Sequence, residues 1–207
     1  GPSRANPFTG ELYDADIRVS SDYVRWYGKE FEDWITPLSS YEEENNHQVL
    51  DHQCNYAHGK MHQMAFGWSV LNSRGFVNEK DKEKFIHDGL VDLIAHEVGH
   101  TLGLRHNFKA SSIYSLFDLK NKMFTEKNGV TGSVMDYNPV NLSPKGEPQG
   151  SWYHTTLGIY DYWAIEYAYS IYEPDLYVSE EVMLEKNISK VSNPLLQYGT
   201  DEDARGS

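Results

Sequence analysis

The sequence contains a single cysteine, Cys54, among its 207 residues. One thiol cannot form an internal disulfide, so the fold depends on its core and on any metal that it binds. Hydrophobic runs are also short, well below the roughly 20 apolar residues that are needed to cross a bilayer. The sequence therefore predicts neither a disulfide-stapled domain nor a membrane-spanning segment in this chain.

Basic residues are scarce. The chain has 18 lysines and arginines against 31 aspartates and glutamates, a formal net charge of −13. Nucleic acid is an unsuitable partner for such a surface, because phosphate binding requires positive charge. Acidic surfaces are common on exported proteins, and carboxylates are also the ligands that calcium prefers. No Asp/Asn/Gly loop of EF-hand spacing is present, so calcium is kept only as an alternative.

The length and composition favour one domain over residues 1–207. A chain with 39% hydrophobic and 14% aromatic residues is long enough to bury one substantial core. Two small subdomains around a cleft are the alternative. Gly1-Pro2-Ser3 and Arg205-Gly206-Ser207 have the character of vector-derived ends, so we expect a fragment excised from a longer protein.

Local patterns predict several elements before residue 78. Residues 9–19 begin with turn-forming residues and then alternate between apolar and polar, which indicates a strand. Residues 20–37 place apolar side chains at helical spacing and end at Pro37, which predicts a helix. The short apolar run from Gly67 to Leu71 is interpreted as another strand.

Histidines are dense between residues 47 and 62. Two of them are four residues apart, as on one helical face, but the spacing matches no zinc finger or knuckle. Surface and core histidines are therefore the favoured interpretation, and a second metal site stays open as the alternative. The residues concerned are His47, His52, Cys54, His58 and His62.

A longer helix is predicted to begin after Asn78, a residue type that caps helix N-termini. Leu90, Ile94, Val98 and Leu102 follow at a spacing of four residues. An apolar stripe of this kind usually faces the core, so we expect it to anchor the helix.

Residues 96–106 read His-Glu-Val-Gly-His-Thr-Leu-Gly-Leu-Arg-His and extend this helix. At about 100° per residue, His96 and His100 are only about 40° apart around the helix axis, so both imidazoles face one point. Ile94 lies about 200° from His96, which predicts the apolar stripe on the opposite side from the two histidines.

A third ligand follows from the glycine in the motif. Gly103 is able to adopt a positive φ, end the helix and turn the chain back, so that His106 supplies a third nitrogen. Three protein ligands leave one zinc position open for a water whose pKa falls to about 7, the arrangement of catalytic zinc. Glu97 is then the general base that takes the proton of this water. The competing interpretation, incidental histidines on a buried helix, explains neither the glycine nor the third histidine.

The segment from Gly132 to Tyr137 supplies a second motif about thirty residues downstream. Together with the long histidine motif it resembles the metzincin zinc metalloproteases. The resemblance implies that Met135 lies in a tight Met-turn, an apolar floor below the zinc. It also implies that Tyr137 binds zinc or stabilises the oxyanion, as in the astacin and serralysin branches. Residues 157–167, with Asp161 near the start, resemble the C-terminal metzincin helix.

Four stretches, three of which overlap the motifs above, resemble the EcxA-type bacterial zinc-dependent metalloproteases, whose members are larger, exported proteins with additional N-terminal regions. The similarity implies a secreted, periplasmic or cell-surface bacterial protein. Asn107, after the third ligand, fits this group and departs from the better-known branches. The stretches are Thr9 to Glu11 with Asp14 to Ile17, His100 to Ser112, Ser133 to Asn138 and Tyr160 to Glu166.

The expected fold is an α+β zincin-like catalytic domain. A twisted sheet and the active-site helix, in a subdomain of about residues 1–106, lie above the cleft, and an irregular, mainly helical subdomain of about 107–203 carries the Met-turn below it. A peptide or protein substrate is expected to lie extended along an edge strand, for which Leu12 to Val19 is the candidate. By resemblance, the wall of the S1′ pocket is expected near Asn138 to Ser143.

The expected activity is that of a zinc-dependent endopeptidase with one catalytic zinc, hydrolysing peptide bonds through a zinc-bound water activated by Glu97. One alternative is a catalytically silent zinc module that acts in binding or adhesion, although Glu97 would serve no purpose there. A second alternative is a zinc hydrolase that acts on another amide or on an ester, because the water-activating chemistry is shared.

Overall fold

The structure, a computed structural model, describes residues 3–17, 56–75, 78–171 and 179–204. The helix predicted over residues 20–37 lies outside these ranges, as do His47, His52 and Cys54. In the described part the chain is mostly helical. None of its helices is long and apolar enough to span a membrane.

The elements follow in a simple order along the chain. Two strands come first, two long helices follow, and short helices joined by irregular segments make up the rest. They are β1 (Ser3–Ala5), β2 (Leu12–Ala15), α2 (Tyr56–Ser73), α3 (Glu79–Thr101), η2 (Ala110–Ile113), α4 (Leu116–Lys120), α5 (Lys122–Asn128), α6 (Ile159–Tyr169), α7 (Glu180–Ile188), η3 (Ser189–Ser192), η4 (Pro194–Leu196) and α8 (Asp201–Ala204).

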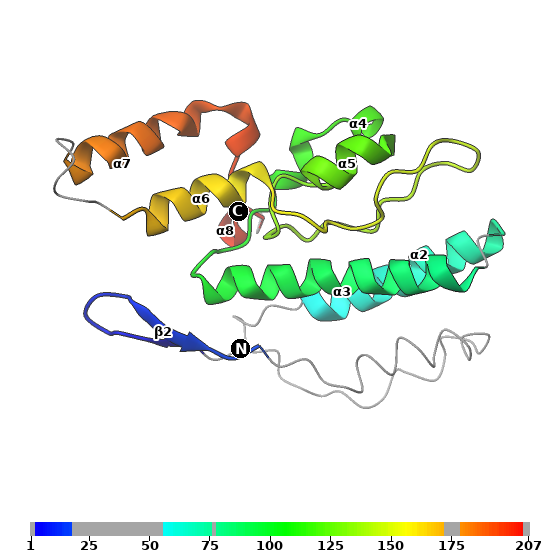
Figure 1. Ribbon diagram of the computed structural model, residues 1–207, viewed down its shortest axis with the longest axis horizontal. Helices are drawn as coiled ribbons and strands as arrows, with labels where there is room; N and C mark the ends of the chain where they lie inside the picture. Colours follow the sequence, from blue (N-terminus) through cyan, green and yellow to red (C-terminus); the bar gives the residue numbers. More distant parts are fainter. Residues whose placement is uncertain (1–2, 18–55, 76–77, 172–178, 205–207) are drawn as a thin grey trace.

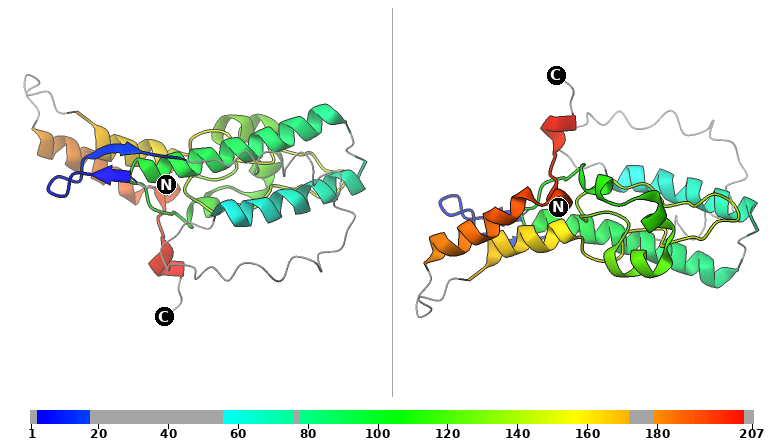
Figure 2. Two further views of the ribbon diagram at one scale, coloured as in Figure 1. Left: turned by 90° about the horizontal axis from the view of Figure 1, so that it is seen from below. Right: turned by 90° about the horizontal axis from the view of Figure 1, so that it is seen from above.

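Helix α3 is the central element. Figure 1 shows α3 crossing the molecule with the hairpin on one side and the C-terminal helices on the other, and Figure 2 shows α2 lying alongside it. Strands β1 and β2 pair antiparallel, with Ser3 opposite Ala15. The strand predicted within residues 9–19 is therefore present but shorter, and within the described ranges the sheet has two strands.

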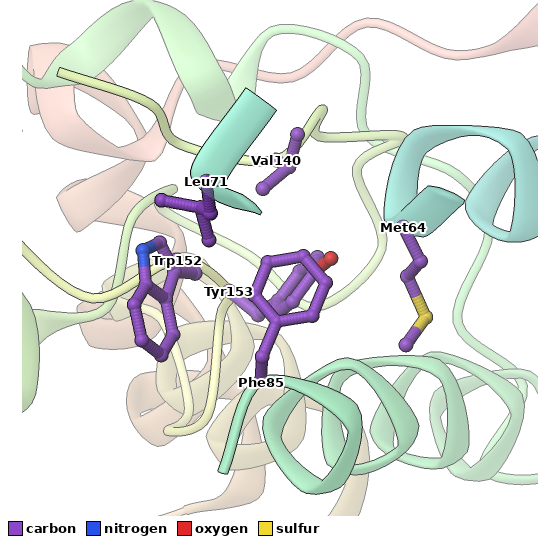
Figure 3. Packing of buried hydrophobic residues seen from close by; sticks show 6 residues of the cluster. All are labelled: Met64, Leu71, Phe85, Val140, Trp152 and Tyr153. Atoms are coloured by element: carbon purple, nitrogen blue, oxygen red, sulfur yellow. The ribbon is translucent and has the colours of Figure 1, made fainter. Parts of the chain in front are cut away.

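The main core lies between α2, the first half of α3 and the irregular segment before α6 (Figure 3). Phe85 packs edge-on against Trp152 and Tyr153, with ring centroids 5.4 and 5.0 Å apart. A smaller cluster joins α6 to η4 through Tyr160, Ala164 and Leu196. The first cluster holds Val140, Trp152 and Tyr153, which lie between α5 and α6, against α2 and α3.

The strand predicted from Gly67 to Leu71 is wrong, because these residues belong to α2. A short apolar run does not by itself distinguish a strand from a buried helix segment. The buried positions of α2 are Tyr56, Lys60, Met64, Gly67 and Leu71. Their spacing of three and four residues is helical, but the burial of a lysine among them hides the pattern in the sequence.

The prediction that the apolar stripe of α3 faces the core is confirmed for Leu90, which packs against the main core, and is wrong for the three residues that follow it. Ile94, Val98 and Leu102 are each about 40% exposed, at 41%, 39% and 39%. The buried residues of the second half of α3 include Asp92 and His96. The histidine side of the helix is therefore its inward side, because the polar groups on it find partners in the interior.

Candidate metal centre

Both ends of α3 are formed as the sequence predicts. Asn78 Oδ1 accepts a hydrogen bond from the Asp81 amide at 2.8 Å, which caps the N-terminus. Gly103 has φ of 83°, and the amides of Gly103 and Leu104 donate to the carbonyls of His100 and Gly99, each at 3.0 Å. These bonds form a Schellman motif, which ends the helix and returns the chain toward its own last turn.

The returning chain brings His106 to the two helical histidines. One ligand nitrogen from each of His96, His100 and His106 lies within 4.8 Å of the others. The Nε2 atoms of His100 and His106 are 3.1 Å apart. The structure thus brings the three predicted ligands together in one cluster.

Each histidine ring is oriented by an oxygen acceptor on its other nitrogen. The Nδ1 atom of His96 lies 2.7 Å from the Val134 carbonyl oxygen, and that of His100 lies 3.0 Å from the Leu104 carbonyl oxygen. The Nδ1 atom of His106 lies 3.1 Å from both carboxylate oxygens of Asp201. Because Nδ1 donates in all three rings, Nε2 is left with a lone pair for a metal. Burial lowers the pKa of His96 to about 3, so this ring is neutral, as a ligand must be.

Met135 lies directly against the ligand helix. It is fully buried, and a Cβ atom built on Gly99 would lie 2.2 Å from its Sδ atom. The Asn107 amide donates to the Met135 carbonyl at 3.0 Å, which ties this turn to the residue after the third ligand. Met135 therefore packs against α3 at Gly99, between His96 and His100.

Asp161 holds the turn that carries Met135. Its carboxylate accepts from the Ser133 hydroxyl at 2.6 Å, from the Val134 amide at 2.9 Å and from the Gly158 amide at 2.7 Å. The last bond caps α6, as its place near the start of that helix suggests. The Ser133 hydroxyl also accepts from the Met135 amide at 3.0 Å, and this bond fixes the peptide whose carbonyl orients His96.

The Tyr137 ring lies close to two of the histidine rings, whereas Glu97 is the residue next to His96 on α3. The ring centroid of Tyr137 is 4.7 Å from that of His106 and 5.5 Å from that of His96. Glu97 follows His96 on α3 and is half-buried. Tyr137 is thus brought to the histidines by the fold, whereas Glu97 is placed by the helix that both residues share.

A family model described as Met-zincin matches residues 78–207, which is more than half of the chain. The chain belongs to the Met-zincin family. The matched region includes α3, the three histidines and the turn of Met135. No curated protein and no solved structure matches the chain.

Family membership and the histidine cluster together indicate a zinc metallopeptidase. The chemistry of the site fits zinc, which takes neutral imidazole nitrogens as ligands in its catalytic sites. In the described part of this Met-zincin chain, the three histidines are the one group of three or more metal-binding side chains. The structure therefore gives no support to calcium.

Several functional candidates were not predicted from the sequence. Asp201 lies 95 residues after His106, so no local spacing connects them. Tyr56 places its ring 4.2 Å from that of His96 and 4.9 Å from that of Tyr137. The burial of Lys60 and Asp92, with 0% of each side chain exposed, also has no signal in a pattern of apolar residues.

A cavity of about 290 Å³ lies beside Tyr137. One wall comes from the first turns of α2, and the other comes from the segment after Met135. Asn138 and Pro139, which begin the segment expected to form the S1′ wall, belong to the second wall. The lining residues are Tyr56, Gly59, Lys60, Gln63, Tyr137, Asn138 and Pro139.

Proposed function

We propose that this Met-zincin chain is an endopeptidase that hydrolyses internal peptide bonds, with zinc held by His96, His100 and His106. The observation that carries the proposal is the orientation of the three histidines. Each Nδ1 atom has its own oxygen acceptor, so the opposite nitrogens converge on one point. Three neutral imidazoles leave a coordination position open, which is typical of catalytic zinc and not of structural zinc.

The proposed reaction assigns a separate task to each nearby side chain. Zinc, when bound, supplies a Lewis acid that polarises the scissile carbonyl and acidifies water. Glu97 takes the proton of the attacking water and delivers it to the leaving amine. The Tyr137 hydroxyl donates a hydrogen bond to the developing oxyanion, and Met135 supports the ligand helix from below. The ring contacts of Tyr137 with His106 and His96 support its placement in this role.

The hairpin and the cavity suggest how a peptide would lie. Strand β2 pairs with β1 along one edge, and no other described strand pairs with it. We place an extended peptide along the other edge of β2, where it would add as a further strand. One substrate side chain would enter the cavity next to Tyr137. Secretion from a bacterial cell stays a prediction from the EcxA-type resemblance.

The test is cleavage of a proteome-derived peptide library by zinc-loaded protein, with the cut sites identified by mass spectrometry. We expect cuts inside the peptides, and we expect Glu97→Gln to retain zinc and fold but to lose most turnover. Glu83→Gln changes an exposed carboxylate on the same helix and should cut like the wild type. Zinc-loaded protein that cuts no peptide would favour the binding module. Cleavage restricted to ester or non-peptide amide substrates would favour the other hydrolase.

A further inference from the structure

Lys60 is a lysine buried in the interior of the protein. Lys60 lies on α2 and pairs with Asp92 on α3, and neither side chain is exposed at all. Burying an ammonium and a carboxylate costs more than their attraction returns unless further hydrogen bonds satisfy both groups. The groups that hydrogen-bond to Lys60 and Asp92 therefore indicate which part of the structure this ion pair holds in place.

All three donors of the ammonium are used. Besides Asp92, Lys60 Nζ donates to the Tyr56 hydroxyl at 2.9 Å and toward the Asn138 carbonyl oxygen at 3.4 Å. Asp92 in turn lies 3.1 Å from the Tyr56 hydroxyl and accepts from the Asn138 amide group at 3.3 Å. Four side chains from α2, α3 and the segment after Met135 thus form one closed network.

Two members of the network place Tyr137. Asn138 follows Tyr137 directly, so fixing its carbonyl and side chain fixes the end of the Tyr137 backbone. The Tyr56 ring stacks on the Tyr137 ring at 4.9 Å with an angle of 23° between the planes. The opposite side of the network is Asp92, which lies one helical turn before the ligand His96. The network therefore connects Tyr137 to the helix that carries two of the ligands.

We propose that Lys60 is a positioning residue for Tyr137, which it holds over the histidine cluster through Tyr56 and Asn138 with Asp92 as counter-ion. The inference rests on the proposed function, in which the Tyr137 hydroxyl donates to the oxyanion. All of these residues except Asp92 also line the 290 Å³ cavity, so the network sets the position of Tyr137 relative to a bound peptide. Buried polar networks of this kind specify geometry more than they add stability.

The central experiment removes both charges together. The variant Lys60→Met/Asp92→Asn leaves no unpaired buried charge, so we expect one zinc per chain and a melting temperature within about 4 °C of the wild type. Peptide cleavage should nevertheless fall about tenfold to a hundredfold, mainly in kcat, because the tyrosine is no longer held in its reactive position. The matched control is Lys190→Met/Glu166→Gln, which removes an ion pair with side chains 41% and 51% exposed and should leave cleavage unchanged.

A double-mutant cycle distinguishes positioning from a general structural role. In a Tyr137→Phe background, the Lys60→Met/Asp92→Asn change should lower kcat less than about threefold, because the Tyr137 hydroxyl that the network positions is already absent. The proposal would be overturned if the Lys60→Met/Asp92→Asn change lowered kcat as much in the Tyr137→Phe background as in the wild type. It would also be overturned if the double variant had wild-type kcat or lost its zinc. If the double variant does not fold, Tyr56→Phe takes its place. It keeps the stacked ring and removes one hydroxyl, and its loss of kcat should likewise disappear in the Tyr137→Phe background.

A spectroscopic measurement separates this inference from the proposed function. In protein labelled with 3-fluorotyrosine, the fluorine resonance of Tyr137 is the one that disappears in Tyr137→Phe. We expect the double variant to shift or split this resonance. A wild-type protein that cuts no peptide would end the proposed function, yet the shift would still show that Lys60 positions the ring. An unchanged resonance would end the positioning role even if the enzyme is active.

Discussion

Gly99 and Met135 are so close that a Cβ atom on Gly99 would lie 2.2 Å from the Met135 Sδ atom. Gly99 lies on α3 between the candidate ligands His96 and His100, and Met135 is fully buried beneath it. The contact requires glycine, because no real Cβ atom tolerates such a distance. The fourth residue of the histidine motif thus serves the packing of the turn below the helix.

Gly99→Ala is therefore expected to destabilise the protein. Forcing one extra carbon into this packed contact should cost about 1–3 kcal/mol of unfolding free energy, measured by urea denaturation. Gly59→Ala is the control, since its Cβ atom meets nothing within 4 Å, and in a helix it should add about 0.5–1 kcal/mol. Equal stability of Gly99→Ala and wild type would show that Met135 is not held in place.

Metal content should depend on the three histidines. We expect one zinc per chain by elemental analysis, and its loss in His96→Ala, His100→Ala or His106→Ala. Zinc that binds the native state alone adds about 4 kcal/mol of stability at 1,000 times its Kd, so a chelator should lower the melting temperature. Full zinc content in all three variants would contradict the ligand assignment.

Asp201→Asn should weaken zinc binding while preserving the fold. The carboxylate accepts from the His106 Nδ1 atom, and loss of such an outer partner typically lowers metal affinity by about 10- to 100-fold. Competition with a chromogenic chelator gives the affinity. Glu202→Gln alters the adjacent residue, which pairs with Arg105 at the surface, and should change the affinity less than about twofold.

Tyr137→Phe should lower kcat and kcat/KM together, by a factor of roughly 100 to 1,000. This is the typical effect of removing one oxyanion donor, about 2.7 to 4 kcal/mol. Zinc content and melting temperature should hold, because the ring and its contacts remain. If the variant retains more than about a third of wild-type kcat, Tyr137 acts in packing alone.

His154 should make the protein less stable in acid. The ring is fully buried, its Nε2 atom has no hydrogen-bond partner among the described residues, and burial lowers its pKa to about 4. The unfolded chain takes up this proton near pH 6.5, so stability is complete above pH 6.5 and falls as the pH drops toward 4, by about 3 kcal/mol. Denaturation of wild type and His154→Gln at one zinc concentration should show a steeper loss in the wild type. Parallel pH curves would exclude His154 as the cause.

The parts of the site that were predictable depend on local geometry. The helix from Asn78, the common direction of His96 and His100, and the turn at Gly103 follow from helix periodicity and from the conformational freedom of glycine. These rules act over a few residues, so they can be applied to the sequence without knowledge of the fold. The family match agrees with the assignment that they led to.

The incorrect predictions concern which side of α3 is buried and whether Gly67 to Leu71 form a strand or a helix. The stripe of Ile94, Val98 and Leu102 is apolar and yet exposed, whereas Lys60 and Asp92 are charged and yet buried. Hydrophobic patterning cannot anticipate such an exchange, because the burial of a charge depends on partners that come from other elements. The same reason explains why Gly67 to Leu71 was assigned to a strand.

The sequence alone determined the three candidate ligands and the glycines that shape the motif, since backbone geometry fixes their relation within eleven residues. The tertiary structure decided which acceptor orients each ring and what lies beneath the helix. Val134, which orients His96, lies 38 residues after it in the chain. Met135 lies 36 residues after Gly99, and Asp201 lies 95 residues after His106. Such contacts arise when separate segments pack against each other, and no short-range rule of sequence contains them.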